Sequence, residues 1–571
     1  MKNFFVHVRK YIFLTFLPLG TLIALMAYYA VDIPHGDEWA IVPLIEKFYA
    51  GTLTFADFFA QHNEHRILTG KIIMLLNAIL TGWNMYIEMA INVALAIGTS
   101  IVIYYATEKL TGIDSKKRGI LYFASAWIIF SFTQQQCYLW GFMMQLFMSV
   151  FFNVLTIALL TYGGSIILAL IFAVLATFSF ANGMVIWPIG LMLLCCSGKI
   201  RFSKIFLWLG ASAVCISLYF YNFNYGTLRK PILDNIIYLL THPHMIIIPI
   251  VTYLGSPLSS YRQSIAISAG TIGLAMYIYS IFTITINKAW DNNKFFWTGC
   301  GLYVLLSAAV TAYGRSTSIS AAIALRYVPG QMLFWVAAPC LLFITLEMKN
   351  KIAFKWYVIV LAVIISLSVS EDALTKARES SEIRTIFLTQ LERGQYDNKF
   401  FVNNISGRND VKRIFGLKKY GIRHFYNAPE NIVFDDFKQI NIERNTIKHD
   451  EALSIEKLEL ASDDFFILRG WYQTDDYCTQ DYRDKLKYSV ILYDDVNAFE
   501  AEMDNIPEER RHSVSAIFVR KNIYDTFHRS YFLGNQLYYG SLPEGRYNIA
   551  VKIISPDGQE RLYGLDEIIT R

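Results

Sequence analysis

The stretch YIFLTFLPLGTLIALMAYYAV at residues 11–31 is followed almost at once by His35-Gly36-Asp37-Glu38-Trp39. The first stretch is apolar and uncharged, and about 20 such residues cross the hydrocarbon core of a bilayer as a helix. The second stretch is a polar cluster that a membrane anchor does not need. Together they predict a membrane protein with a polar site just beyond its first span.

The composition extends this prediction to the whole chain. Its 571 residues are 54% hydrophobic and 17% charged, with a mean hydropathy of +0.35, which is typical of a polytopic α-helical membrane protein. The net charge of +5 is small for this length and does not indicate a nucleic-acid partner. The seven cysteines lie mostly in apolar stretches without metal-type spacing, so we expect them to be buried hydrophobes.

Apolar periodicity predicts about eleven membrane spans, with edges uncertain by several residues. They lie near residues 11–31, 83–107, 118–133, 141–162, 165–181, 184–197, 204–222, 263–287, 295–312, 330–346 and 354–370.

The loops rich in Lys and Arg predict the orientation, because such loops stay in the cytoplasm. All of them fall on one side if the N-terminus is cytoplasmic, which makes the loop at 32–66 and the C-terminal region extracytoplasmic. The basic clusters are Lys2 to Lys10, Lys109 to Arg118, Lys199 to Lys204 and Lys349 to Lys355.

Two further apolar segments are not counted as spans. Residues 244–256 are too few to cross a bilayer and are expected to be re-entrant or interfacial. Residues 67–82 contain Lys71, whose charge would be costly at mid-bilayer, so we expect a helix that leads up to the second span.

The pattern divides the chain into three parts. Residues 1–371 form the transmembrane domain, residues 372–440 a helical linker region, and residues 441–571 an extracytoplasmic domain. From about residue 453 short apolar runs alternate with turn signals, which predicts a β-sandwich. The fold class is therefore a polytopic helical membrane protein with a C-terminal α+β region.

The first outer loop carries the clearest candidate site. Asp37 or Glu38 could act as a general base, could hold a divalent cation, or could simply be solvated loop carboxylates. The run His62-Asn63-Glu64-His65-Arg66 precedes an apolar helix, and on a helix His62 and His65 would share a face. These residues could contact a sugar or phosphate, bind a metal, or cap the helix, and the sequence leaves all three open.

Three more polar clusters fall on the same predicted face. Gln145 lies in the segment 134–145, Asn182 in the turn 179–188, and Arg315, Arg326 and Tyr327 in the segment 313–327. Arginines here could bind a lipid phosphate through bidentate contacts, or could reach lipid headgroups as snorkelling side chains. Convergence of separate clusters on one side predicts a shared substrate cavity.

These motifs resemble a known family. An N-in first span, an early acidic motif and a C-terminal extracytoplasmic domain resemble membrane glycosyltransferases of the GT-C fold. A nearer likeness, over residues 1–370, is to bacterial multispan proteins with an HNEHR signature, some related to enzymes that decorate O-antigen with glucose. The matching segments are HNEHR at residues 62–66, LWGF..Q from Leu139 to Gln145, ANG…WP from Ala181 to Pro188 and GR…RY from Gly314 to Tyr327.

The resemblance implies an inverting glycosyltransferase in the bacterial inner membrane. It would move a sugar from a polyprenyl-phosphate donor to a surface polysaccharide or lipid-linked glycan, as in O-antigen modification and lipopolysaccharide biosynthesis. Asp37 or Glu38 would be the catalytic carboxylate. Arg66, Arg315 and Arg326 would be candidates to stabilise the leaving phosphate.

The resemblance also bears on cofactors and partners. The chain lacks an obvious second acid in a later outer loop, which leaves assistance by a divalent cation open, and we assign no metal ligand. Expected partners are the lipid bilayer, the donor lipid and a glycan acceptor, with a donor-lipid synthase and flippase implied by the O-antigen likeness alone.

Two other functions remain open from the sequence. An O-antigen polymerase or ligase also has many spans and outer arginines, although its large loop usually lies between late spans. A transporter or flippase of lipid-linked sugar would show charged or broken helices at mid-membrane depth.

Overall fold

The computed structural model describes the chain in two compact units. A helical unit contains the described residues up to 422, and a β-rich unit contains those from 438 onward. The described residues are 13–196, 202–224, 244–259, 262–314, 325–347, 371–393, 416–422, 438–442, 447–448, 453–462, 465–473, 485–506, 529–538 and 542–570.

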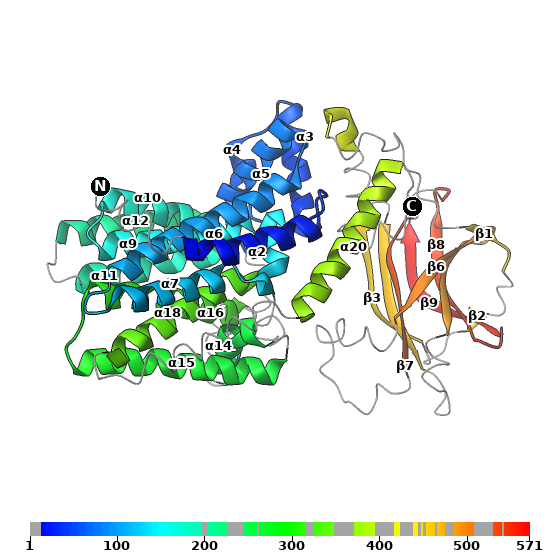
Figure 1. Ribbon diagram of the computed structural model, residues 1–571. Coiled ribbons are helices and arrows are strands. Elements are labelled where there is room, and N and C mark those ends of the chain that lie inside the picture. The colour runs from blue at the N-terminus through cyan, green and yellow to red at the C-terminus, as the bar shows by residue number, and fades with distance from the viewer. Residues whose placement is uncertain are drawn as a thin grey trace. The chain divides into compact units, whose positions relative to one another are not determined.

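Long helices that lie side by side dominate the helical unit (Figure 1). Its α-helices are α2 (Phe13–Tyr29), α3 (Val42–Tyr49), α4 (Phe55–Phe59), α5 (Leu68–Thr81), α6 (Met85–Glu108), α7 (Ser115–Ile129), α8 (Gln135–Tyr138), α9 (Met144–Thr161), α10 (Ile166–Thr177), α11 (Ile186–Cys196), α12 (Phe202–Phe220), α14 (His244–Gly255), α15 (Gln263–Ile286), α16 (Asn292–Gly314), α18 (Val328–Glu347) and α20 (Glu371–Arg393). The 3-10 turns used below are η1 (Gly36–Ile41), η2 (Phe132–Gln134), η3 (Gly141–Met143), η4 (Ala181–Val185), η7 (Leu325–Tyr327) and η8 (Gly416–Tyr420).

Among the described residues, six helical stretches are long and apolar enough to cross a membrane. They are α6, η3 with α9, α12, α15, α16 and α18. Four other expected spans coincide with the shorter helices α2, α7, α10 and α11, and the span expected at 354–370 lies outside the described residues. The membrane-crossing character is therefore supported, and the count of eleven stays a prediction.

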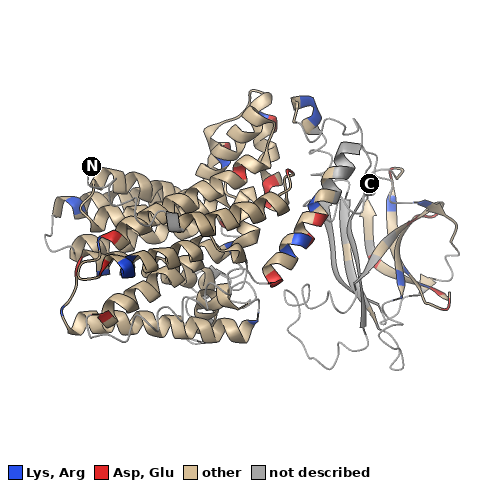
Figure 2. Ribbon diagram, viewed as in Figure 1, with Lys and Arg blue, Asp and Glu red and all other residues tan. Residues whose placement is uncertain are grey.

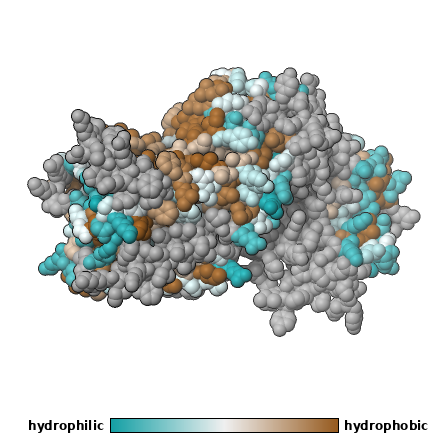
Figure 3. All heavy atoms as spheres, in the orientation of Figure 1, coloured by the Kyte–Doolittle hydropathy of each residue, from teal (hydrophilic) through white to brown (hydrophobic). Residues whose placement is uncertain are grey.

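The outer surface of the helical unit is apolar. Phe206 of α12 is 70% exposed and Ile272 and Phe282 of α15 are each 61% exposed, whereas α18 is buried along most of its length. Figure 3 shows brown, apolar residues over much of the described surface of this unit, and Figure 2 shows its charged residues mainly near the ends of the helices. Because exposed apolar area costs about 25 cal/mol per Å² in water, this surface indicates a lipid environment.

Two glycines set the closest helix contact in the unit. A Cβ atom on Gly270 of α15 would lie 1.7 Å from the Val251 carbonyl oxygen, and one on Gly255 of α14 would lie 1.9 Å from the Ala266 carbonyl oxygen. Only glycine permits this approach, as in other membrane helix pairs. The apolar segment 244–256 is thus a short helix packed tightly against α15.

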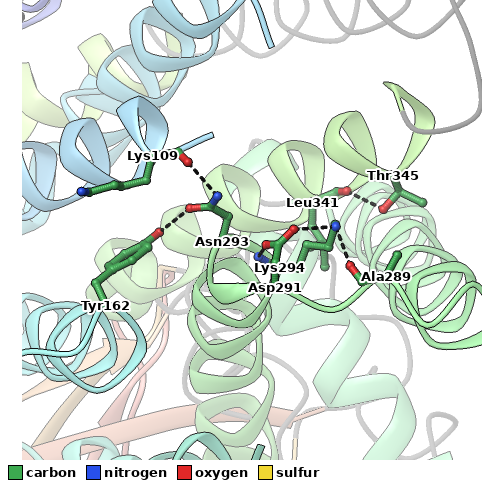
Figure 4. A network of polar contacts seen from close by, with 8 residues as sticks. All are labelled: Lys109, Tyr162, Ala289, Asp291, Asn293, Lys294, Leu341 and Thr345. Atoms are coloured by element: carbon green, nitrogen blue, oxygen red, sulfur yellow. Dashed lines mark hydrogen bonds and ion pairs between the residues drawn. The ribbon is translucent and has the colours of Figure 1, made fainter. Parts of the chain in front are cut away.

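Polar contacts join the helix ends at one side of the bundle (Figure 4). The Asn293 side chain donates to the Lys109 carbonyl oxygen at 2.7 Å and accepts from the Tyr162 hydroxyl at 3.2 Å. Lys117 of α7 pairs with Glu347 of α18 at 2.9 Å. The ends of α6, α9 and α18 and the starts of α7 and α16 therefore meet at the side that the basic loops predict to be cytoplasmic. The orientation in a membrane stays a prediction.

The C-terminal unit is a small, mostly antiparallel sheet, as the alternating pattern predicted. Its hydrogen-bonded order is β2-β9-β8-β5-β6-β7-β4-β3, with β1 paired to β6 and one parallel pair, β2 with β9. The strands are β1 (Lys438–Ile440), β2 (Ile447–Lys448), β3 (Leu453–Ser462), β4 (Phe465–Gln473), β5 (Lys487–Tyr493), β6 (Ala498–Ile506), β7 (Arg529–Tyr538), β8 (Arg546–Ile554) and β9 (Glu560–Thr570).

One strand joins the two halves of this sheet. Residues 498–503 of β6 pair with β5, and residues 504–506 pair with β7. Leu468 and Tyr472 of β4 belong to the same buried core as Val490 of β5 and Tyr563 of β9, and the Tyr472 and Tyr563 rings are 5.6 Å apart. Alternate residues of distant strands therefore share one core, which stabilises the unit.

The glycine contact between α14 and α15 predicts a large effect of a single methyl group. We expect Gly270→Ala to lower the thermal unfolding midpoint in detergent, because overpacking of this kind costs about 1–3 kcal/mol. Gly210→Ala is the matched control, since nothing lies within 4 Å of a Cβ at that position of α12. Equal midpoints for the two variants would contradict the tight contact.

Candidate functional site

The loop after α2 is held in shape by one glycine and one tryptophan. Gly36 adopts φ +57°, and a Cβ on it would lie 2.9 Å from the Trp140 ring. The Trp140 indole N–H donates to the His35 carbonyl oxygen at 2.9 Å, and the two rings meet edge to face at 5.6 Å. The acidic motif and the LWGF segment, a hundred residues apart in the chain, therefore form one structure.

Glu38 lies inside this structure. It is 1% exposed and its carboxylate accepts from the backbone N–H groups of His35 at 2.5 Å and Phe142 at 3.0 Å. Burial raises its pKa to about 7, against the lowering by backbone donors that include Gly141 and by the Arg384 guanidinium. Glu38 thus serves as an internal acceptor that locks η1 onto η3.

Asp37 differs from its neighbour in access. It is half-buried, whereas Glu38 is fully buried. Burial lowers the pKa of His62, and the negative charge of Asp37 opposes that shift. Of the two acids that the sequence could not rank, Asp37 has the exposure that a general base needs.

His62 and His65 do not lie on a helix, so the helical spacing expected for them is wrong. They form a two-residue hairpin turn in which each donates its backbone N–H to the other's carbonyl oxygen, at 2.8 and 2.9 Å. Asn63 takes φ +48°, a left-handed value that asparagine tolerates, and Glu64 is partly exposed. Residues that pair directly across a hairpin lie on the same face, so His62 and His65 share a face on the turn as well.

Arg66 anchors this hairpin to the rest of the unit. It is 4% exposed, and its guanidinium donates to the carbonyl oxygens of Tyr219 at 2.6 Å, Tyr221 at 2.5 Å and Phe59. Lys71 on α5 binds the Ala60 carbonyl oxygen at 2.6 Å in the same way. Because the guanidinium of Arg66 already donates to backbone carbonyl oxygens, we do not assign Arg66 to the leaving phosphate of a donor.

Aromatic rings connect the remaining motifs in one row, which we call the aromatic row. It is defined by His35, Trp140, Phe142, His62, His65, Phe180 and Tyr327. Trp140 stacks on Phe142 at 6.0 Å, and Phe142 meets His62 edge to face at 5.3 Å. His65 lies 4.1 Å from Phe180, whose ring is 6.5 Å from that of Tyr327. The segments 35–39, 62–66, 139–145, 178–183 and 326–327 therefore lie close together, whereas the membrane topology stays a prediction.

The other predicted site residues have different surroundings. Gln145 is 3% exposed and its side-chain oxygen has no hydrogen-bond partner within the described residues. Asn182 is buried in η4, beside Gly183, where a Cβ would lie 1.8 Å from the Ala176 carbonyl oxygen. Arg326 is partly exposed and lies over the Tyr327 ring at 5.8 Å. Arg315 lies outside the described residues.

Sequence reasoning missed several residues of the site. Glu88 of α6 is fully buried and approaches Glu38, because a Cβ on Gly141 would lie 2.6 Å from Glu88 Oε2 and 2.9 Å from Glu38 Oε1. Asn92 donates to the Trp140 carbonyl oxygen at 3.0 Å. Arg384 of α20 donates to the Leu139 carbonyl oxygen. An acid and an amide within a predicted span were the signal that could have revealed Glu88 and Asn92.

Within the part of the chain that the structure describes, no cluster of three or more His, Cys, Asp or Glu side chains could hold a metal ion. Comparison of the chain with protein-family models, with curated proteins and with solved structures finds no match. The function must therefore be argued from the site itself.

Replacing Gly36 tests the contact between the two loops. We expect Gly36→Ala to lower the thermal midpoint and to disturb the site, because a left-handed backbone costs an L-residue roughly 1–2 kcal/mol and the new methyl group meets Trp140. Gly51→Ala is the matched control. Gly51 also has a positive φ, but no atom lies within 4 Å of a Cβ there, so only the backbone strain should lower its midpoint. A Gly36→Ala midpoint no lower than that of Gly51→Ala would contradict the Trp140 contact.

Glu38 also predicts a pH dependence. Its pKa is about 7 in the folded protein, against about 4.3 in an unfolded chain, so its contribution is complete below about pH 4 and is lost as pH rises through 7. His35 opposes it: burial lowers its pKa to about 4, from about 6.5 unfolded, so its contribution grows with pH over that window.

The comparison that isolates Glu38 is therefore wild type against Glu38→Gln, with thermal midpoints measured from pH 5 to pH 8. We expect the advantage of the wild type to shrink as the pH rises. A midpoint difference between wild type and Glu38→Gln that stays constant or grows with pH would show that folding does not raise the pKa of Glu38.

Proposed function

We propose that this protein is an inverting glycosyltransferase that uses a polyprenyl-phosphate sugar as donor and acts at the extracytoplasmic face of a bacterial inner membrane. The observation that carries the proposal is the convergence of five separated segments on an accessible carboxylate, two histidines and a row of aromatic rings. We propose further that the membrane domain is GT-C-like, with about eleven spans.

Asp37 would act as the general base. It would take the proton from the acceptor hydroxyl as the hydroxyl oxygen attacks the anomeric carbon of the donor. The bond from that carbon to the phosphate oxygen breaks, and polyprenyl phosphate leaves from the opposite face, so one displacement inverts the anomeric centre. His62 would hydrogen-bond the carboxylate or the incoming hydroxyl, because burial favours its neutral form, which both donates and accepts.

Substrate contacts follow from the same cluster. Trp140, Phe142 and Phe180 are buried and would form the wall behind a bound sugar, with direct contacts to its polar edges left to the partly exposed His62 and His65. Arg326 is the described arginine with access to the site, so it is our candidate for the leaving phosphate. We retain Arg315 as a second candidate from the sequence.

The C-terminal unit would serve the acceptor. We propose that it is a β-sandwich on the extracytoplasmic side that binds or orients a glycan such as O-antigen. Tyr472 is part of its core and therefore supports the fold. A divalent cation remains an optional cofactor, and a donor-lipid synthase and flippase are the expected partners.

The first experiment compares surface polysaccharide from cells with the gene intact, deleted, or carrying Asp37→Asn. We expect both altered strains to lose one side-branch sugar, because removal of a general base slows transfer by about 10²–10⁴-fold. Asp57→Asn is the matched control: this carboxylate lies in the same outer loop but is bound to Lys47 outside the cluster.

Other outcomes would overturn the proposal. Loss of long polysaccharide chains in the deletion strain would indicate a polymerase or ligase. Unchanged glycan in both altered strains would favour transport of a lipid-linked sugar. Normal transfer by purified Asp37→Asn protein, with polyprenyl-phosphate sugar supplied, would remove Asp37 from the role of base.

A further inference from the structure

One helix beside the site buries a cation that a surface helix does not need. α20 is charged along its length, and its neighbouring residues Arg378 and Thr385 are exposed. Its buried positions are Ala373, Ala377 and Arg384, which is 5% exposed. Two alanines allow a close approach, whereas an arginine on the same face is costly unless it meets an acceptor or an opposite charge.

Arg384 meets both. Its guanidinium donates to the carbonyl oxygen of Leu139, and its positive charge acts on Glu38. Glu38 and Glu88 flank Gly141 from two elements, η1 and α6. Two acids packed this closely disfavour each other's ionised form, and the positive charge of Arg384, which lowers the pKa of Glu38, therefore reduces the cost of a buried charge at Glu38.

The segment that Arg384 binds forms a wall of the site. Leu139 is held by Arg384, Trp140 by Asn92, and Phe142 by Glu38. Trp140 and Phe142 belong to the aromatic row, and Asp37 directly precedes Glu38 in the chain. Displacement of the guanidinium would therefore loosen both the buried rings of Trp140 and Phe142 and the loop that carries the proposed base.

We propose that Arg384 is a positioning residue that docks α20 on segment 139–142, which the buried acids Glu38 and Glu88 flank, and thereby holds this segment and the Asp37 loop in their working geometry. Its effect on transfer rests on the function proposed above, whereas its effect on the buried charges does not. Arg384 touches no reacting atom and acts through Glu38 and Leu139.

A double-mutant cycle on the intact, detergent-purified protein tests this proposal. Arg384→Met, Glu38→Gln and the double variant are compared by thermal midpoint, with Arg378→Met on the exposed face of α20 as the matched control. We expect Arg384→Met to lower the midpoint by roughly 5 °C or more, because it leaves buried charge unpaired. The control should match the wild type, and Arg384→Lys should recover part of the loss.

The double variant separates charge compensation from general packing. At pH 8, above the pKa of about 7 that burial gives Glu38, the Glu38→Gln change removes a carboxylate charge, so in the Arg384→Met background it should restore part of the midpoint rather than lower it further. Additive losses in the double variant, or an Arg384→Met midpoint equal to that of Arg378→Met, would overturn the proposal. This readout needs no substrate, so it reports on Arg384 even if Asp37→Asn proves active and the glycosyltransferase proposal fails.

Activity supplies the second readout. If transfer is measured with polyprenyl-phosphate sugar, Arg384→Met should lower kcat by more than it raises KM, since Arg384 contacts no substrate. Recovery of kcat by the Glu38→Gln partner change would support positioning through Glu38. A pure rise in KM would assign Arg384 to substrate binding and overturn the positioning role.

Discussion

The site depends on one buried carboxylate and the backbone groups that surround it. Glu38 accepts hydrogen bonds from the N–H groups of His35 and Phe142, on two loops that are distant in the chain. An acid buried this deeply is costly unless its oxygens are bound, so the two loops cannot separate without exposing unpaired polar groups. The positions of Trp140 and Asp37 both follow from this lock, as does the need for a left-handed glycine at residue 36.

The packed helices bring the two loops that Glu38 joins to one end of the helical unit. Close contact through Gly255 and Gly270 and polar contacts through Asn293 at the other end align the helices. Apolar side chains that face outward on α12 and α15 would be unfavourable in water but suit lipid. Within this frame, a polar side chain that looks costly in a span, Asn92, holds the loop at Trp140 by a hydrogen bond to its carbonyl oxygen.

The sequence was informative about which segments matter and less so about what their residues do. The motifs at 35–39 and 62–66 were recognised by their polarity beside apolar helices, and they do meet. Yet Arg66, a candidate for phosphate binding, donates its hydrogen bonds to backbone carbonyl oxygens. The histidine pair lies on a turn rather than a helix. Local spacing cannot reveal such partners, because Tyr219 and Tyr221 lie more than 150 residues away.

What the sequence by itself determined is the set of helices apolar enough to cross a membrane, the strand-rich C-terminal region and the polar segments that meet at the site. These follow from hydrophobic length and periodicity, which act along the chain and need no tertiary information. Tertiary structure alone decided which of Asp37 and Glu38 is accessible, that Glu88 and Arg384 join the site, and that Arg66 is structural. Burial and hydrogen-bond partners are properties of residues brought together by folding, so no local pattern in the chain carries them.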